Sequence, residues 1–165
     1  MVLVEVCADS VASVVAAHAG GARRIELCSG LVDGGVTPSV GMVSTVCKVA
    51  AGLLPPMPIM VLIRARGGDF VFTEDEVSIM VCDIEAVAAA GAAGVVVGAL
   101  SANGEIDLPV AHRLIAAARK YGLLVTFHRA IDMTPDPLAA FVRYLKDSTG
   151  FCSSSCHQCI SDWIS

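Results

Sequence analysis

The sequence is poor in charged and aromatic side chains. Of its 165 residues, 16% are charged and 5% are aromatic, and the formal net charge is −5. No stripe of basic residues interleaves with aromatic ones, which argues against binding to nucleic acid. The first ten residues carry no basic region, and Glu5 interrupts their apolar run, so we expect no signal peptide.

Long apolar runs are also missing, although 55% of the residues are hydrophobic and the mean hydropathy is +0.72. The longest uncharged stretch, 86–104, consists mainly of Ala and Gly, and it predicts a helix end, a turn and a buried strand. We therefore expect no membrane span. A high apolar content is typical of a parallel α/β protein, whose strands are covered on both faces.

Cysteine is plentiful, with seven copies. Four are spread singly along the chain, and three cluster near its end. Because we expect no secretion signal, we also expect these thiols to be reduced. The cysteines therefore indicate a cytoplasmic location, with the nucleus as a further compartment.

Strand-like runs alternate with helix-like runs along the first 146 residues. The strands are expected at 3–8, 24–28, 59–64, 94–100 and 123–128. The helices are expected to begin at Ser10, Ser39, Thr73, Asp107 and Asp136, and Thr73 forms a capping box with Glu76. The last helix is expected to turn Leu138, Phe141, Val142 and Leu145 toward the core. Strict alternation of this kind implies a parallel sheet with right-handed crossovers.

The glycine pattern decides between two parallel architectures. No GxGxxG motif follows the first strand, which favours a (β/α) barrel over a doubly wound sheet. A complete TIM barrel has eight units in roughly 200 residues or more, and this chain supplies five units. The sequence therefore predicts an α/β fold, an incomplete TIM barrel of about five β/α units that spans residues 1–146.

The segment 147–165 has a different texture, with six serines, three cysteines and no strand–helix rhythm. We expect it to be disordered or foreign to the fold, as in a splice variant, a frameshift or a truncated gene model. The alternative is a small metal knuckle that uses Cys152, Cys156, His157 and Cys159, because CxxC is a metal-ligand spacing.

Two predicted strands carry the same pattern, an acid followed two residues later by a thiol. These pairs are Glu5 with Cys7 and Glu26 with Cys28. Residues i and i+2 of a strand share a face, so on parallel neighbouring strands the two carboxylates and two thiols converge. Two thiolates suit Cu(I), which prefers sulfur. The alternative is that both cysteines are small buried hydrophobic residues.

Basic side chains follow the third and fifth strands. Arg64, Arg66 and Arg129 are candidates for binding a phosphate or carboxylate, since Arg offers a planar fork of donors. The alternative is that Arg64 and Arg66 neutralise the acids Glu5, Glu26 and Asp69 in a buried network.

The candidate catalytic residues are Glu5, Glu26 and His128, which supply acid–base groups at the strand ends. His128 has the character of a general base or a metal ligand, and the alternative is a hydrogen-bonded histidine at a strand end. The pattern fits a barrel enzyme that acts on a small anionic substrate.

Five ordered motifs give the chain a specific resemblance. They are Glu5-Val6-Cys7, Arg24-Ile25-Glu26-Leu27-Cys28, Gly34-Gly35-Val36-Thr37-Pro38-Ser39, Arg64-Ala65-Arg66-Gly67-Gly68-Asp69-Phe70, and Thr126-Phe127-His128-Arg129-Ala130-Ile131-Asp132-Met133. Together they make the chain resemble the CutC copper-homeostasis family over roughly 3–145. The resemblance implies a TIM barrel and a role in copper handling, with Cys7 and Cys28 as the Cu(I) ligands. It does not settle an enzymatic activity.

Two departures from the family pattern stand out. Ala65 stands where the family has proline, and three further strands with a late glycine-rich segment are missing. Five strands do not close a barrel, so the first and fifth strands would be open edges, which favour pairing into a homo-oligomer. The resemblance therefore also allows a third interpretation, an inactive truncated isoform.

Overall fold

The computed structural model describes residues 3–147, and within this range strands alternate with helices as the sequence predicts. The predictions for the tail, including the metal knuckle at Cys152, Cys156, His157 and Cys159, lie outside the described residues. The elements are β1 (Glu5–Ala8), α1 (Val11–Ala19), β2 (Arg24–Leu27), η1 (Leu31–Asp33), α2 (Val40–Ala51), β3 (Ile59–Leu62), α3 (Glu74–Ala89), β4 (Gly94–Val97), α4 (Leu108–Lys120), β5 (Leu124–Phe127), η2 (Arg129–Met133) and α5 (Pro137–Asp147).

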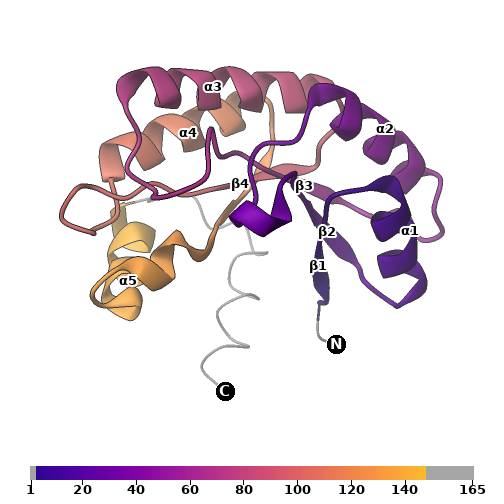
Figure 1. The fold of residues 1–165 in the computed structure, drawn as a ribbon, viewed down its shortest axis with the longest axis horizontal. Helices are drawn as coiled ribbons and strands as arrows, with labels where there is room; N and C mark the ends of the chain where they lie inside the picture. Colours follow the sequence, from indigo (N-terminus) through magenta and orange to yellow (C-terminus); the bar gives the residue numbers. More distant parts are fainter. Residues whose placement is uncertain (1–2, 148–165) are drawn as a thin grey trace.

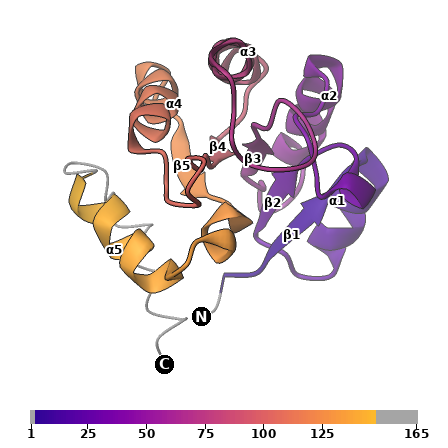
Figure 2. The same cartoon turned by 60° about the vertical axis from the view of Figure 1, so that its left-hand side comes forward.

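The strands form one parallel sheet in the order β1-β2-β3-β4-β5. Figure 1 shows helices covering one side of this sheet, and Figure 2 shows the strands as the inner layer of an arc whose outer layer is helical. The arc does not close within the described residues. This confirms an α/β fold of incomplete-barrel type. Strands β1 and β5 form its two edges, and their pairing with another chain stays a prediction.

Side-chain caps set where the helices begin. The hydroxyls of Ser10, Ser39 and Thr73 each accept a hydrogen bond from a backbone N–H of the first turn, and Asp107 does the same with its carboxylate. Glu76 returns a bond to the backbone of Thr73, so the predicted capping box is confirmed. These helix starts are therefore determined by local capping residues in the sequence.

The main core lies between the sheet and its helices. The side chains of Ile25, Leu27, Val61, Met80 and Ile84 are fully buried there. Alternate strand residues point to the other, concave face, where a smaller buried cluster joins Cys28, Met60, Leu62 and Val96. The stretch 86–104 contains the end of α3 and strand β4, and none of the described helices is long and apolar enough to cross a bilayer.

Helix α5 differs from its predicted orientation. Leu138 and Val142 were expected to face inward, but they are 65% and 42% exposed. Phe141 packs against a buried cluster as predicted, and the prediction for Leu145 lies outside the described side chains. Among the α5 residues whose side chains are described, Ala140 and Tyr144 are buried, and Tyr144 packs with Ala111 and Ile115 of α4. The helix is rotated because an aromatic ring, rather than its aliphatic residues, fills the space beside α4.

Strands β3 and β5 are shorter than predicted. They end at Leu62 and Phe127, so Arg64 and His128 lie just beyond the sheet rather than within it. Both side chains therefore stand at the carboxyl edge of the sheet, where barrel enzymes place their sites.

Candidate functional site

The register of β1 and β2 brings the predicted thiols and acids to one patch of the concave face. Cys7 lies directly opposite Glu26, and the N–H of Cys28 donates to the carbonyl of Ala8 at 3.0 Å. Cys28 is therefore diagonal to Cys7 across neighbouring strands. Cys7 is exposed and Cys28 is buried. We call Glu5, Cys7, Glu26 and Cys28 the thiol–carboxylate cluster.

Glu5 finds its cation partner on the neighbouring strand. It lies opposite Arg24, and the Nε of Arg24 forms an ion pair with its carboxylate. The alternative that Arg64 and Arg66 neutralise Glu5, Glu26 and Asp69 is therefore wrong for Glu5, whereas Asp69 does pair with Arg66. The two Glu-x-Cys motifs do not lie side by side but are shifted by two residues. Such a stagger between neighbouring strands is what a barrel requires.

Glu26 is a buried acid with an unusual titration. Burial, and then the charge of Glu5, raise the pKa of Glu26 to about 6, although Arg24 acts in the opposite direction. A carboxyl group with this pKa exchanges protons near neutral pH, which suits a general acid or base. The structure thus places this candidate beside Cys7, on the concave face.

Both thiols of the cluster are held in the protonated form. Burial, and then the charges of Cys7, Glu26 and Asp9, raise the pKa of Cys28 to about 11. Burial raises the pKa of Cys7 as well, helped by Glu26 and Glu5. Neither cysteine is a reactive thiolate, but a field that opposes thiolates also attracts a cation.

The cluster offers a metal two thiols and no larger ligand set. Among residues 3–147, no three His, Cys, Asp or Glu side chains are grouped as ligands of one metal ion. A hard or tetrahedral metal needs more ligands than this pair provides. Two diagonal sulfurs in an acidic surrounding fit a soft monovalent cation better.

Arg64 is a buried guanidinium held by backbone oxygens. Its side chain is 3% exposed, and its Nη1 donates to the carbonyl of Gly35 at 3.0 Å and to that of Asp33 at 3.4 Å. Its Nη2 donates to the carbonyl of Gly68 at 2.5 Å, and the group stacks over Phe70. Burial, and then the charges of two other arginines, lower its pKa. No described carboxylate pairs with it, and its Nε has no hydrogen-bond partner there.

Arg129 lies beside Arg64. Both side chains approach Gly34, because a Cβ placed on that glycine would lie 3.4 Å from Nη1 of Arg64 and 3.7 Å from Nη2 of Arg129. Gly34 also has a φ of +82°, which a larger residue would adopt only with strain. The loop before α2 thus brings two like charges together.

His128 is a buried, neutral hydrogen-bond donor. Its Nδ1 accepts from the N–H of Ala130 at 3.2 Å, so in the neutral ring the proton is on Nε2. Nε2 has no partner among the described residues. Burial, and then the charge of Arg64, lower the pKa of His128 to about 4. Gly98 lies so close that a Cβ there would overlap the imidazole. We call Arg64, His128 and Arg129 the guanidinium–imidazole cluster.

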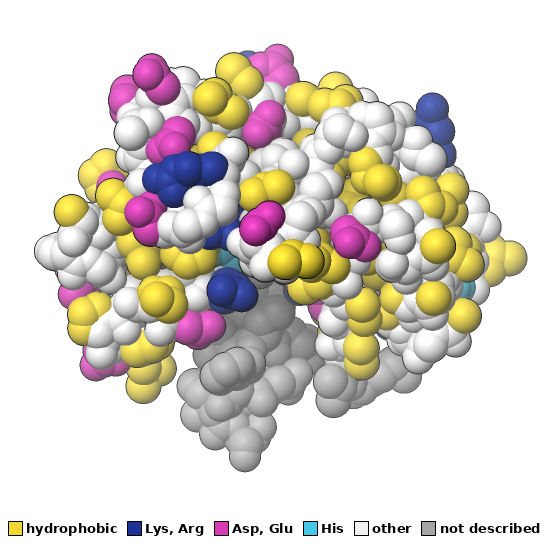
Figure 3. Space-filling model, in the orientation of Figure 1, with side chains coloured by type: hydrophobic (Ala, Val, Ile, Leu, Met, Phe, Trp, Pro, Cys, Tyr) yellow, Lys and Arg dark blue, Asp and Glu magenta, His cyan; other side chains and the backbone are white. Residues whose placement is uncertain are grey.

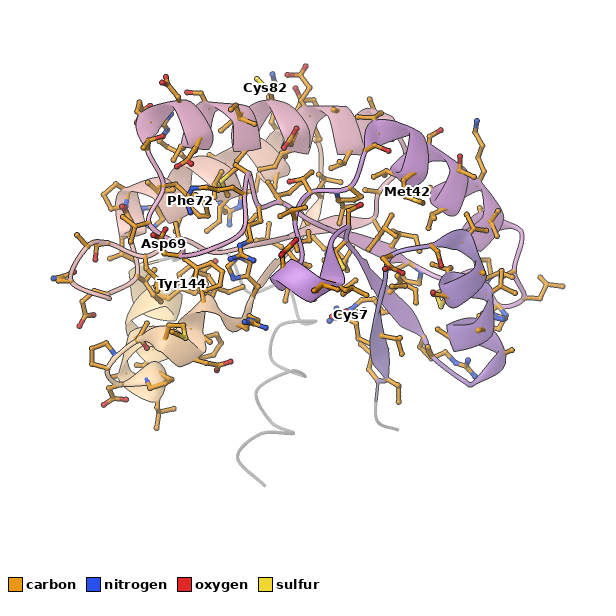
Figure 4. All side chains as sticks on the ribbon, in the orientation of Figure 1. Cys7, Met42, Asp69, Phe72, Cys82 and Tyr144 are labelled. Atoms are coloured by element: carbon orange, nitrogen blue, oxygen red, sulfur yellow. The ribbon has the colours of Figure 1, made fainter. Side chains whose placement is uncertain are left out.

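A cavity of about 650 Å³ opens beside this cluster. Its wall combines Arg64 and Arg129 with the acids Asp33 and Asp69 and with apolar side chains, among them Leu31, Phe70, Val71, Leu100 and Met133. Figure 3 shows basic and acidic side chains gathered around a hollow of this face. Figure 4 shows Asp69 and Phe72 on one side of the molecule and Cys7 on the other.

Arg66 lies outside this arrangement. Its side chain pairs with Asp69 at 3.0 Å and with Glu76 at 2.5 Å, and it also donates to the carbonyl of Val71. It therefore connects the loop after β3 to the start of α3, and its donors are already engaged.

Three contributors to the site were not singled out from the sequence. Arg24 pairs with Glu5, Gly34 admits the two guanidinium groups, and Gly98 makes room for His128. The signal for Gly98 was a glycine at the end of a β-branched strand, which often marks a close approach. The pairing of Arg24 had no local signal, because it depends on strand register.

Comparison with known proteins identifies the relatives of this chain. The family model described as CutC family matches residues 2–146. A CutC family protein from Bacteroides thetaiotaomicron is 51% identical over 142 residues, which cover 86% of this chain and 55% of the relative. The copper homeostasis protein cutC homolog of Mus musculus is 49% identical over 138 residues, covering 84% and 48% respectively.

A solved structure agrees with the fold. The crystal structure of a protein from Streptococcus agalactiae, described as a copper homeostasis protein CutC, is similar with a TM-score of 0.79 and 31% identity, over 87% of this chain and 67% of that one. The chain spans about half the length of the curated relatives it matches. The match over nearly all described residues shows that this chain belongs to the CutC family.

Proposed function

We propose that the protein handles copper and binds one Cu(I) ion through Cys7 and Cys28. The observation that carries this proposal is the diagonal placement of the two thiols on β1 and β2. A curated relative is named a copper homeostasis protein, which agrees with it. Cu(I) is soft, prefers sulfur and accepts two ligands.

The electrostatics of the cluster support a cation as its occupant. Glu5 and Glu26 both oppose the ionisation of Cys7, so two bound thiolates need a compensating positive charge. Cu(I) displaces the thiol protons and supplies that charge. We place this binding in the cytoplasm, where thiols stay reduced.

The test is an anaerobic Cu(I) titration of the full chain against a chromogenic chelator. We expect one tight site that is lost in Cys7→Ser/Cys28→Ser. Cys47→Ser/Cys82→Ser is the matched control, because those cysteines lie on α2 and α3, away from the cluster. A variant with Ser at Cys152, Cys156 and Cys159 separates the tail thiols. Loss of the tight site in the tail variant, or its persistence in Cys7→Ser/Cys28→Ser, contradicts the proposal.

A second candidate function is catalysis on a small anionic substrate. The observation that favours it is the buried guanidinium of Arg64, which forms no ion pair with a described carboxylate and whose Nε has no hydrogen-bond partner there. In this scheme Arg64 and Arg129 hold the anion and Glu26 exchanges the proton. His128 donates from Nε2 instead of acting as a base, because its neutral ring already carries that proton.

The test of this second function is a turnover screen of phosphate esters and carboxylates with the full chain. We expect Glu26→Gln to lower kcat with little change in KM, since Glu26 would move a proton rather than bind substrate. A screen without turnover, or full activity in Glu26→Gln, counts against catalysis by this residue.

A further inference from the structure

Two buried nitrogen atoms of the described structure carry hydrogens without an acceptor. They are Nε of Arg64 and Nε2 of His128, and both side chains are more than nine-tenths buried. Buried donors in folded proteins are nearly always paired, and an unpaired one costs free energy. The two donors share a neighbourhood, because Phe70 lies 4.6 Å from the guanidinium carbon of Arg64 and 5.0 Å from the imidazole centre.

The rest of the cluster adds positive charge. Arg129 approaches Gly34 and lines the same cavity as Arg64, and no ion pair joins it to a carboxylate within residues 3–147. Asp69 also lines that cavity, but its carboxylate already accepts from Arg66 and from the N–H of Val71. The wall therefore carries the two guanidinium groups of Arg64 and Arg129 and, besides the engaged Asp69, the carboxylate of Asp33.

The chemistry of these donors selects the ligand. A metal cation needs lone pairs, and the two guanidinium groups on the cavity wall offer none. An oxyanion offers several acceptor oxygens and negative charge, and Arg binds both carboxylate and phosphate. The apolar side chains of Leu31, Leu100 and Met133 on the cavity wall suit a carbon skeleton attached to that anion.

We propose that this cavity binds a small organic oxyanion, with Arg64 Nε and the guanidinium of Arg129 as donors to the anionic group. This inference deepens the second candidate function, because it names the ligand class and the donor atoms of that site. It is independent of copper binding by Cys7 and Cys28.

The experiment is isothermal titration calorimetry of the full chain at low ionic strength. The probes are inorganic phosphate, glycerol 3-phosphate and pyruvate, so that a phosphate and a carboxylate are tested separately. We expect saturable binding of one molecule per chain for at least one of the two organic probes. The preferred probe then tells which anion the site favours. The absence of saturable binding for all three probes would overturn the proposal.

Variants locate the binding. Arg129→Gln removes an exposed donor and is expected to weaken binding at least tenfold, while Arg113→Gln, an equally charged change on the outer helix α4, leaves it unchanged. Equal affinities in Arg129→Gln and Arg113→Gln contradict the assignment.

The titration also separates this inference from catalysis. It requires neither turnover nor copper, so saturable binding together with a negative turnover screen would support the oxyanion site and reject the enzyme. Turnover by the chain, together with unchanged oxyanion binding in Arg129→Gln, would support the enzyme and reject the proposed oxyanion site.

Discussion

The carboxyl ends of β1 and β2 and those of β3 to β5 belong to one sheet, yet they carry opposite chemistry. The thiol–carboxylate cluster gathers acids and thiols, and burial, followed by their mutual charges, raises the pKa values of Cys7, Glu26 and Cys28. The guanidinium–imidazole cluster gathers donors, and burial, followed by the charges of neighbouring arginines, lowers the pKa values of Arg64 and His128. Parallel strands bring every unit's polar residues to the same edge, and register then decides which of them meet. The comparison teaches that one half is suited to a cation and the other to an anion.

The largest expected effect comes from removing the centre of the donor half. Arg64→Met leaves the carbonyls of Asp33, Gly35 and Gly68 without their donor. We expect a loss of about 4 kcal/mol in the free energy of unfolding, because buried acceptors lose their partners. Urea denaturation measures it. Arg66→Met, two residues away and partly exposed, is the control, and an equal loss there would contradict the role assigned to Arg64.

The second prediction tests whether the two clusters bind their ligands independently. Cys7→Ser/Cys28→Ser should lower Cu(I) affinity by at least about 100-fold, because the sulfur ligands are lost, and should leave the binding of an organic oxyanion intact. Arg129→Gln should do the opposite. Chelator competition and calorimetry measure the two affinities. A variant that impairs both ligands equally would show that the halves form one site.

The third prediction concerns the space that holds the histidine. Gly98→Ala places a methyl group against the His128 imidazole, so either the ring moves or the strand shifts. We expect the free energy of unfolding to fall by about 2 kcal/mol, the usual cost of overpacking. We also expect weaker oxyanion binding. Gly67→Ala is the matched control, because its Cβ would lie an ordinary 3.6 Å from the nearest side-chain atom. Thermal unfolding of the two variants gives the comparison.

The fourth prediction uses the pH dependence of the acidic half. The pKa of Glu26 is raised from 4.5 to about 6 in the folded chain, so its ionisation opposes folding. This penalty is absent below about pH 4.5, grows as the pH rises to about 6 and is complete above it. Glu26→Gln should therefore stabilise the chain by about 2 kcal/mol at pH 7.5 and not at pH 4.5. Urea denaturation at both pH values measures the difference, and an equal effect at the two values would contradict the pKa assignment.

The smallest effect on stability is expected at Arg66, which lies outside the guanidinium–imidazole cluster. Arg66→Gln breaks ion pairs with Asp69 and Glu76 that are open to solvent. We expect only a slight fall in Tm, which disappears in concentrated salt because exposed pairs are screened. Oxyanion affinity should not change. A marked loss of affinity would place Arg66 in the site after all.

The order of the elements could be predicted from sequence because its signals are local. Ser10, Thr73 and Asp107 cap their own helices, and alternation of strands with helices implies a parallel sheet. The orientation of α5 could not be predicted, since it depends on how Tyr144 fits against α4. A helix with apolar residues on several sides has no single inward face until its neighbour is known.

The site was predicted in its residue types but not in its pairings. The sequence placed Glu5, Cys7, Arg64 and His128 at the carboxyl ends of strands. The structure finds Cys7, Arg64 and His128 there or just beyond, but Glu5 lies at the amino end of β1. It did not predict that Arg24 would pair with Glu5, because a two-residue stagger between strands leaves no trace in either strand. The carbonyls that hold Arg64 come from loops whose conformation depends on that same side chain.

The contacts of Arg64 also bear on protein engineering. Loops at the carboxyl ends of strands are where barrels usually accept inserted peptides. In this chain the segment 33–37 is fastened to Arg64 by its side chain and by a backbone bond from Thr37 to the Arg64 carbonyl at 3.0 Å. An epitope tag placed there would detach the guanidinium from its acceptors.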